Sequence, residues 1–374
     1  TYTYTGNHLK AVQDYIANEN LQGEKKNTMN VGLDISVGKK AYNFQIDYHR
    51  SKVNNMMVYQ TLPPEFGSTD YVDNGGELEI SGLELDANGR FNIGQAVLIL
   101  DGAFTYQGSK IKKLDFIDTD TKFMTREVEG GAEYIASENN PVNAFYGYKT
   151  NGVYNTDAEA LVTVNGVTRP MIGPNGYAMG AGDVTFVDIS GPNGRPDGVI
   201  SEFDKQIIGN PNPDFFGSFT AAVAIKRFEI SALFNYSVGN DMFNYVRSKT
   251  TAMDSYANQS TDVLDRWTNA NPNGTLPEAM LGDPHGNNVF SDRWIEDASF
   301  MRVKQLMVSY TAPKLGSFNK ETKFYITGTN LFTFTKYSGY NPETMLHSDP
   351  YYMGIDYGKL PLAPSVIVGI QLSL

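Results

Sequence analysis

The chain has 374 residues, of which 41% are hydrophobic and 19% charged, and its formal net charge is −12. This acidic balance excludes a nucleic-acid surface, which needs clustered Lys and Arg, and no run of residues approaches the ~18 apolar residues of a membrane-spanning helix. The absence of cysteine excludes a disulfide framework and thiolate chemistry. The 36 Gly, 23 Tyr and 21 Phe favour an all-β protein with many tight turns and aromatic-rich strands.

The N-terminal third alternates between apolar and polar residues, the period of a strand whose two faces meet different surroundings. Residues 30–38 and 44–49 both show this alternation, and further strands are predicted near 77–92 and 95–111. The lack of a spanning helix does not exclude a membrane protein, because a barrel strand needs only about 9 to 11 residues of such alternation. The apolar rows are Val31, Leu33, Ile35 and Val37 in the first segment and Phe44, Ile46 and Tyr48 in the second.

The C-terminal part repeats the same pattern. Strands are predicted near 214–226, 228–237, 300–311 and 322–335, and the last residues alternate as well. The total is about nine or ten strands, counted from this period-2 pattern. The apolar row of the last strand is Val366, Val368, Ile370, Leu372 and Leu374.

The predicted strands are joined unevenly. Some turns are tight, whereas other connections are long and rich in Gly, Pro and Asn, which is the asymmetry of an outer-membrane barrel with long extracellular loops. A soluble β-sandwich usually spaces its strands more evenly. The tight turns lie at 38–41 and 226–228, and the long connections at 51–76, 112–213, 240–298 and 336–360.

Aromatic residues collect where one strand would leave the hydrocarbon. The sequence "NLFTFTKY" at 330–337 carries Phe332, Phe334 and Tyr337. Such rings suit the aromatic girdle of a membrane barrel. Rings that fill the core of a soluble protein explain this stretch equally well.

Two prolines separated by one residue precede the strand predicted at 214–226. Proline cannot donate to a sheet ladder, so Pro211 and Pro213 mark a boundary outside the ladder. Asn210 and Asn212 favour turns at the same place. We therefore expect these residues to end a long excursion and to set the start of a membrane strand.

No catalytic motif is found. The four histidines, at positions 8, 49, 285 and 347, lack ligand spacing, and no nucleophile motif, phosphate-binding loop or zinc motif occurs. The chain is therefore not expected to be an enzyme.

Two loop segments have predictable local structure. Residues 260–267 are expected to form a short loop helix capped by Ser260 or Thr261, with Trp267 packed beneath the loop or stacked on a sugar. The segment 291–300 is expected to form a salt-bridged loop base that combines Asp292, Arg293, Glu296 and Asp297 with Arg302 and Lys304.

One segment resembles a calcium-binding loop. In "NGRPDGVISEFD" at 193–204, Asp197 and Asp204 stand at the fifth and twelfth positions, with Ser201 between them. Asn193 and Arg195 are poor matches at the first and third positions, and Asp188 is displaced by an insertion. A Gly/Asp-rich turn held by local hydrogen bonds explains the same residues and is the preferred interpretation. Calcium is the one cofactor that the sequence suggests.

Five sequence blocks in the same order, together with the segment 19–37, resemble the C-terminal barrel half of the SusC/RagA-type TonB-dependent transporters. They include "GDVTFVDISGPNGRPDGVISEFDKQIIGNPNPDFFGSFT" and "SDRWIEDASFMRVKQLMVSYTAPKL", and the resemblance covers nearly the whole chain. The blocks lie at 141–160, 182–220, 263–279, 291–315 and 323–343.

The resemblance implies an antiparallel transmembrane β-barrel of about 22 strands with a plugged lumen. It implies a place in the outer membrane of a Bacteroidetes-type bacterium and TonB-dependent import of an oligosaccharide or oligopeptide. The implied partners are a SusD-like surface lipoprotein that covers the mouth, TonB and the outer-membrane lipid. The alternative function is a soluble or surface-attached β-sandwich that binds carbohydrate without transport.

Nine or ten strands cannot close a barrel of about 22 strands, and bare sheet edges are unstable in lipid. We therefore expect residues 1–374 to be the C-terminal part of such a barrel, with the plug domain and the N-terminal barrel half absent from this sequence. No ligand-binding residue can be assigned, and glycan and peptide remain equally open as ligands.

Overall fold

The computed structural model describes residues 2–5, 8–11, 15–16, 18–38, 41–61, 70–115, 123–128, 130–313, 322–344 and 352–372. Its side chains are described from residue 18 on, apart from those of residues 59–61 and 70. The predicted alternation of residues 373 and 374 lies outside the described residues. None of the described helices is long and apolar enough to cross a membrane.

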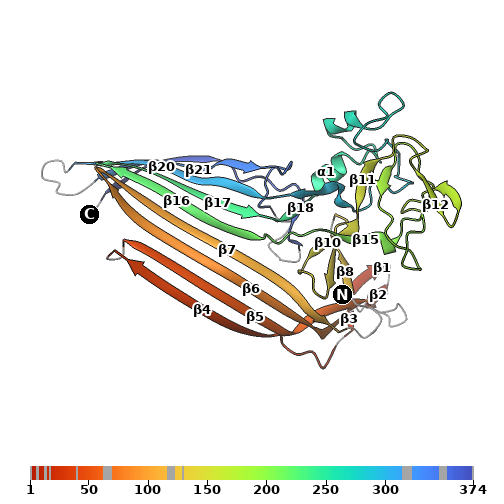
Figure 1. Ribbon diagram of the computed structural model, residues 1–374, viewed down its shortest axis with the longest axis horizontal. Coiled ribbons are helices and arrows are strands. Elements are labelled where there is room, and N and C mark those ends of the chain that lie inside the picture. Colours follow the sequence, from red (N-terminus) through yellow and green to blue (C-terminus); the bar gives the residue numbers. More distant parts are fainter. Residues whose placement is uncertain are drawn as a thin grey trace.

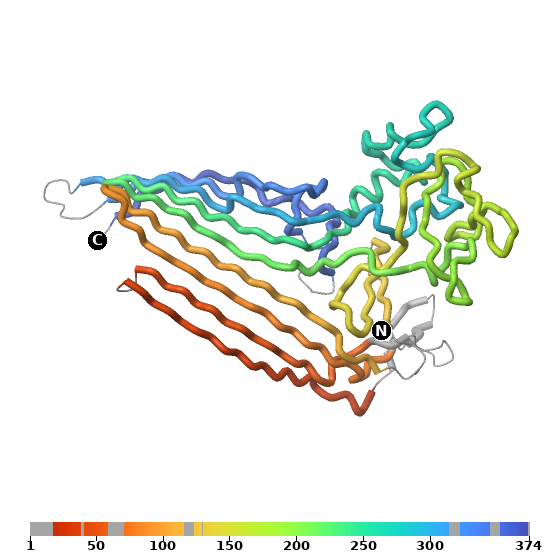
Figure 2. The backbone as a smooth tube through the Cα atoms, in the orientation of Figure 1, coloured from red at the N-terminus to blue at the C-terminus, as the bar shows by residue number. Residues whose placement is uncertain are grey.

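One ten-stranded sheet dominates the molecule (Figure 1). Its strands are antiparallel neighbours in the order β23-β21-β20-β17-β16-β7-β6-β5-β4, and β3 pairs with β6 in parallel at the side. Figure 2 shows the sheet curved like part of a barrel wall, with tight turns at one end and the loop segments at the other. The strands are β3 (Tyr15–Ile16), β4 (Lys25–Val37), β5 (Tyr42–Thr61), β6 (Asp70–Ile93), β7 (Ala96–Leu114), β16 (Phe215–Ile225), β17 (Phe228–Val238), β20 (Phe300–Ala312), β21 (Thr322–Thr335) and β23 (Ser365–Leu372).

The segments between β7 and β16, between β17 and β20 and after β21 form a loop body at one end of the wall (Figure 1). Its strands are short and belong to small separate sheets. They are β8 (Phe123–Glu127), β9 (Glu133–Ser137), β10 (Ala144–Tyr148), β11 (Thr150–Val153), β12 (Leu161–Val164), β13 (Val167–Pro170), β14 (Val184–Phe186), β15 (Lys205–Gly209), β18 (Asp241–Asn244), β19 (Ile295–Asp297) and β22 (Ile355–Asp356). The helices are η2 (Glu202–Asp204), α1 (Tyr245–Thr250), η3 (Thr261–Asp265) and η4 (Asp292–Trp294), and β1 (Tyr2–Thr5) pairs with β2 (His8–Ala11).

The two faces of the wall differ in chemistry, as the alternation predicts. On the outer face, large apolar side chains stand exposed in rows that follow the strand register, for example Val31 opposite Tyr48 and Ile326 opposite Val368. Val368 is 76% exposed. No other layer of the described residues covers these rows, so a sandwich does not describe this sheet. A continuous apolar belt of this kind is the lipid-facing surface of a barrel.

The chemistry of the faces inverts toward the loop body. Beyond Tyr48, the outer positions of β5 are Arg50 and Lys52, which pair with Glu79 and Glu77 across the sheet. On the inner face at this level, a buried apolar cluster receives residues of the loop body. The cluster consists of Val58, Ile111 and Leu114, with Met56, Leu78, Ala136 and Val142 packed against it.

This inversion corrects the connection expected at 51–76. β5 continues to Thr61 and β6 begins at Asp70, so both strands run past the apolar belt. The alternation persists there, but its phase is reversed, since Ser51 and Val53 are buried on the inner face. The other three long connections lie broadly where they were expected.

One further detail differs from expectation at the loop end. Phe332 and Phe334 project from the outer face as a girdle would require, whereas Tyr337 is buried and hydrogen-bonded to Asp356 in the loop body.

The proline segment lies where it was predicted, because Pro211 and Pro213 separate the two strands β15 and β16. The side chain of Asn210 accepts from the Asn212 backbone N–H at 3.1 Å, which forms the expected turn.

Candidate functional site

The inner face of the wall is polar and mainly acidic. Register places Asp34 opposite Gln45 and Gln45 opposite Asp86, while Asn88 lies opposite Asp101 on the next row. The carboxamides link neighbouring strands, because Asn43 Nδ2 donates to Asn88 Oδ1 at 2.8 Å. A shallow groove of about 120 Å³ opens on this face. It is lined by Asp86, Ala87, Asn88, Asp101, Gly102, Ala103, Ser218 and Thr220.

A larger pocket of about 540 Å³ lies where the wall meets the loop body. Its walls come from β16, β17 and β20, from the proline segment before β16 and from the segments that follow β21. The lining is mostly apolar, with a few polar groups, which is the usual make-up of a ligand pocket. The lining residues are Pro211, Pro213, Phe216, Gly217, Asn235, Tyr236, Ser237, Asn240, Met242, Phe300, Pro342, Glu343, Thr344, Met353 and Gly354. We call this cavity the mouth pocket.

A buried arginine stands behind the mouth pocket. Arg302 on β20 is only 4% exposed and forms an ion pair with Glu343. Its Nε donates to Thr333 Oγ1 at 2.8 Å and its Nη2 to Asn341 Oδ1 at 2.7 Å. Glu343 also accepts from Asn235 Nδ2 at 2.7 Å. A buried charge needs such a complete set of partners, so this group fixes the wall of the pocket.

The loop base is ion-paired, but not with the partners expected from the sequence. Glu296 pairs with Arg247 at 3.1 Å and Asp292 with Lys149 at 2.7 Å, whereas Arg302 pairs with Glu343. Arg293 instead donates to the Asn287 carbonyl at 2.6 Å and lies over the Trp294 ring. Burial and the nearby Arg247 lower the pKa of the Arg293 guanidinium to about 10, which leaves it charged at neutral pH.

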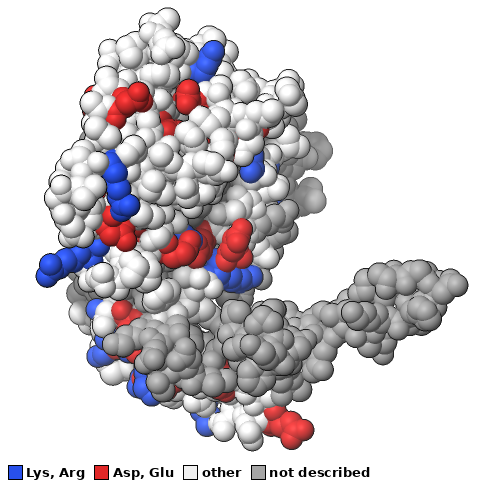
Figure 3. All heavy atoms as spheres, turned by 90° about the vertical axis from the view of Figure 1, so that its right-hand side faces the viewer, with Lys and Arg blue, Asp and Glu red and all other residues white. Residues whose placement is uncertain are grey.

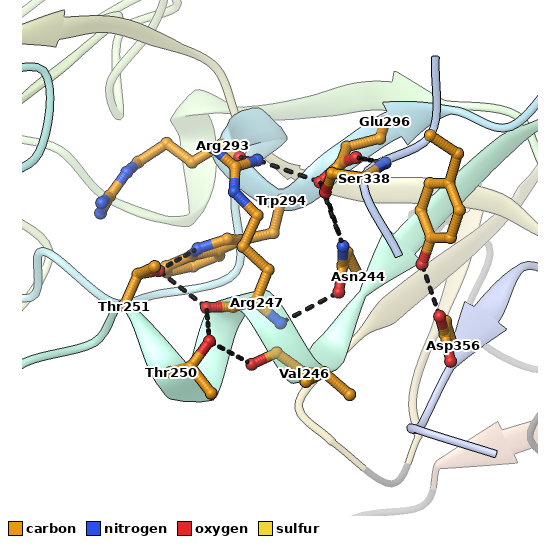
Figure 4. Close-up of polar contacts among 11 residues, drawn as sticks. Asn244, Val246, Arg247, Thr250, Thr251, Arg293, Trp294, Glu296, Ser338 and Asp356 are labelled. Carbon is orange, nitrogen blue, oxygen red and sulfur yellow. Dashed lines mark hydrogen bonds and ion pairs between the residues drawn. The ribbon is translucent and has the colours of Figure 1, made fainter. Parts of the chain in front are cut away.

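Glu296 is the centre of a network that ties three segments together (Figure 4). Its Oε1 accepts from Asn244 Nδ2 at 3.2 Å, from Arg247 Nη1 at 3.1 Å and from Ser338 Oγ at 2.9 Å. Its Oε2 accepts from the Ser338 backbone N–H at 2.8 Å. Asn244 also caps α1 by accepting from the Arg247 backbone N–H at 2.9 Å. The network holds the loops beside the mouth pocket in one arrangement.

Buried tyrosines strengthen the loop body. Tyr134 donates to the Met353 carbonyl at 2.6 Å and Tyr337 to Asp356 Oδ2 at 2.8 Å. Burial raises the pKa of Tyr134 and Tyr337 well above the ordinary value of 10.0, and the Asp356 carboxylate adds to the effect at Tyr337. Burial and the neighbouring Glu202 raise the pKa of Tyr148 in the same direction.

The exposed face of the loop body is mostly uncharged (Figure 3). Figure 3 shows basic and acidic side chains interspersed on this face.

The calcium-like loop at 193–204 is held by bonds from its carboxylates to backbone amides. Asp204 is fully buried and accepts from the backbone N–H groups of Ile189 at 2.9 Å and Ser201 at 2.8 Å. Asp197 accepts from Val199 N–H at 3.0 Å. Among the residues that the structure describes, no group of three or more His, Cys, Asp or Glu is placed to hold a metal ion. Calcium at Asp197, Ser201 and Asp204 is not tested by this geometry, and the hydrogen-bonded turn stays the preferred interpretation.

One further polar pair joins a histidine to a buried aspartate and was not predicted from the sequence. His285 Nδ1 lies 2.9 Å from Asp183 Oδ2, and the buried Asp183 also accepts from Asn287 Nδ2 at 2.9 Å. Asp183 and His285 are more than a hundred positions apart in the sequence, so no local motif predicts their contact. Trp267 packs beneath the loop, as one of the two interpretations expected, with its Nε1 donating to the Asn155 carbonyl at 3.2 Å. Ser260 caps η3, as predicted.

Comparison with known proteins decides the family. Residues 1–193 match the family model for the β-barrel of TonB-dependent receptor-like proteins. The chain belongs to the TonB-dependent receptor β-barrel family. Members of this family are outer-membrane receptors and not enzymes, which places the apolar belt of this chain in the lipid of the outer membrane.

Individual relatives agree with this family. The chain is 28% identical to the TonB-dependent receptor P3 of Formosa agariphila over 95% of its own length and 35% of that protein. It is 26% identical to the TonB-dependent receptor SusC of Bacteroides thetaiotaomicron over 95% of its length and 32% of that protein. The chain thus spans about a third of the length of these curated relatives.

Solved structures show the same fold. The structure of the RagAB peptide transporter matches all of this chain and 38% of the matched chain, with a TM-score of 0.73 and 22% sequence identity. The 'closed-closed' state of the RagAB peptide importer gives a TM-score of 0.74. These structures confirm the expected barrel fold, and the family match together with the SusC relative confirms the expected SusC/RagA type of receptor.

Proposed function

We propose that residues 1–374 form the C-terminal part of the barrel of a TonB-dependent importer, with the plug domain and the first half of the barrel elsewhere in a longer polypeptide. The cargo is a large nutrient, an oligosaccharide or an oligopeptide. The observation that carries the proposal is the opposite chemistry of the two faces of the wall. An apolar outer face with a polar inner face suits a passage through lipid.

The mouth pocket supports a substrate-selecting role for the loop end. The pocket combines the exposed ring of Phe216 with amide, hydroxyl and carboxylate groups from Asn235, Ser237 and Glu343. Such groups serve sugar hydroxyls and peptide amides alike. The fixed network around Glu296 keeps the pocket formed before ligand binding, which lowers the entropic cost of binding.

The proposed partners follow from the family. TonB supplies the energy through the part of the receptor that lies outside this chain, and a SusD-like surface lipoprotein covers the loop end. The RagAB structures are described as those of a peptide transporter. This description favours testing oligopeptides alongside oligosaccharides.

Two phenylalanines on one strand allow a matched test. Phe216 lies in the mouth pocket and is 39% exposed, whereas Phe219 lies on the lipid face and is 37% exposed. In the full-length receptor, Phe216→Ala is expected to weaken binding and uptake of the cargo roughly tenfold, the effect of losing one apolar contact in a pocket. Phe219→Ala is expected to leave cargo affinity unchanged.

The readout is uptake of labelled oligosaccharide and oligopeptide pools by cells that carry each variant, with a strain lacking TonB as the energy control. Import that continues without TonB would contradict the proposal. Equal cargo affinities of the Phe216 and Phe219 variants would show that the mouth pocket does not bind the cargo. The proposal of TonB-dependent import would still stand.

A further inference from the structure

The outer face of the wall carries a group of basic side chains directly beyond the apolar belt. Tyr48, Leu83 and Tyr106 form the last apolar row on strands β5, β6 and β7. The next rows toward the loop body contain charged residues on the same face. We call this group the basic collar. It consists of Lys25, Arg50, Lys52, Lys110 and Lys112, interspersed with Glu77 and Glu79. Lys113 lies opposite Glu77, but it forms an ion pair with Asp115, so this pair adds no net charge and is not counted in the collar.

The strand register fixes the direction of these side chains. Lys52 lies opposite Glu79, and Glu79 lies opposite Lys110, so the three residues share one row and one face. Alternation along β5 places Arg50 and Lys52 on the same face as Tyr48. The collar therefore continues the lipid-facing surface of the belt and does not point into the lumen.

The collar stands on a rigid part of the wall. Behind it, on the inner face, Ile111 and Val58 are almost completely buried, with Leu78 packed against them. At this level the loop body therefore packs against the inner face of the strands, while their outer face is exposed. Basic side chains on such a base are held at a constant height above the belt.

The charge of the collar opposes that of the whole chain. Five Lys or Arg against two Glu leave a net charge of +3, in a chain whose net charge is −12. The glutamates orient the cations, since Arg50 lies 2.6 Å from Glu79 and Lys52 lies 2.7 Å from Glu77. The basic side chains remain open to the outside, with Arg50 57%, Lys52 50% and Lys112 38% exposed.

We propose that the basic collar binds the phosphate groups of outer-leaflet lipid headgroups. The belt places the collar at headgroup height, and long loops mark the extracellular end of a barrel, so the collar meets the outer leaflet. Clusters of basic residues next to a membrane segment bind anionic headgroups. Arg50 suits phosphate in particular, because a guanidinium can donate two parallel hydrogen bonds to it. The proposal does not depend on which nutrient is imported.

The test uses the full-length receptor in detergent, titrated with lipid A, a bisphosphorylated glycolipid, and followed by native mass spectrometry. The triple variant Lys52→Gln, Lys110→Gln, Lys112→Gln removes three collar charges. The control Lys149→Gln, Arg195→Gln, Lys249→Gln removes three exposed charges from the loop body. Each basic residue near an anionic surface contributes up to about fivefold in affinity. We expect a loss of about tenfold for the collar variant, because Glu77 and Glu79 already offset part of its charge, and none for the control.

Two further arms keep the test decisive. Dephosphorylated lipid A should bind the unaltered receptor about as weakly as lipid A binds the collar variant. Glu77→Gln combined with Glu79→Gln raises the charge of the collar and should strengthen lipid A binding, which covers the case in which the triple variant fails to fold. Equal binding by the collar and control variants would overturn the proposal. So would displacement of lipid A by inorganic phosphate at comparable concentration, since the site would then be one for the free anion.

Discussion

Asp204 shows how one carboxylate holds a loop of the receptor. It accepts hydrogen bonds from the backbone N–H groups of Ile189, Ser190 and Ser201 and is fully buried. Asp204→Ala leaves these donors without partners, and each buried donor without a partner costs about 1 to 3 kcal/mol. We expect cleavage by protease within 189–204 to increase strongly. Asp197→Ala is the control and should cost less than about 1 kcal/mol, because Asp197 accepts from a single amide at 3.0 Å.

Calcium at the same loop is tested by metal analysis of the purified receptor. A bound ion at Asp197, Ser201 and Asp204 would survive gel filtration and lose its stabilising effect in chelator. Because these carboxylates already serve backbone amides, we expect no bound calcium and the same melting temperature with and without chelator. If chelator lowered the melting temperature of the unaltered receptor but not that of the Asp197→Ala variant, a bound ion would be established.

Buried tyrosines predict a response to alkaline pH. Burial raises the pKa of Tyr134, Tyr148 and Tyr337 above the ordinary value of 10.0. Above about pH 10 the unfolded chain loses these protons while the folded chain keeps them, so stability falls as pH rises. The absorbance of tyrosinate at pH 11 should be lower in the folded receptor than in denaturant. Equal absorbances in the two states, with the fold intact, would contradict the burial of these hydroxyls.

At the scale of single elements, a charge placed on the two faces of one strand tests the orientation of β4. Leu33→Arg puts a guanidinium against lipid, which costs about 2 to 4 kcal/mol near the bilayer midplane. Asp34→Arg is the adjacent control on the inner face, where it meets the lumen and should change stability little. Unfolding of each full-length variant in urea, reconstituted in lipid, measures the difference. A larger loss for Asp34→Arg would reverse the assigned faces.

The strands were predictable from the sequence, whereas their ends were not. Alternation in the segments with Val31 and Val368 identifies strands because lipid and lumen impose opposite preferences on successive side chains. Beyond Tyr48 the inner face becomes buried and the outer face charged, so the same alternation changes phase at Arg50. A single rule, apolar outside and polar inside, does not recognise a strand that continues from one environment into another. The strand predicted at 44–49 therefore ended too early.

The site residues were less predictable for a different reason. Arg302 and Glu343 are separated by 41 positions, and Arg247 and Glu296 by 49. Their pairing depends on how loops fold over the end of the wall, which no local pattern encodes. The segment around Glu296 was correctly expected to be an ion-paired loop base, since its charges are dense, but its partners come from other loops. Pro211 and Pro213 were placed correctly because proline acts through its own backbone.

On the scale of the whole molecule, the wall separates lipid on its outer face from water on its inner face. The roles proposed for the mouth pocket, the loop body and the basic collar all depend on this separation. The chain contains no cysteine. Single cysteines can therefore be introduced into this part of the receptor without competing thiols from the same segment.

The most direct measurement is the reactivity of single cysteines along β5 in the full-length receptor, in outer-membrane vesicles, toward a charged thiol reagent. Cysteines in place of Gln45 and Asp47 are expected to react, since these positions face the lumen. Cysteines in place of Phe44 and Ile46 are expected to be protected from this reagent and to react with a lipid-soluble one. Equal reactivity of the two sets toward the charged reagent, or protection of the second set from both reagents, would contradict the account.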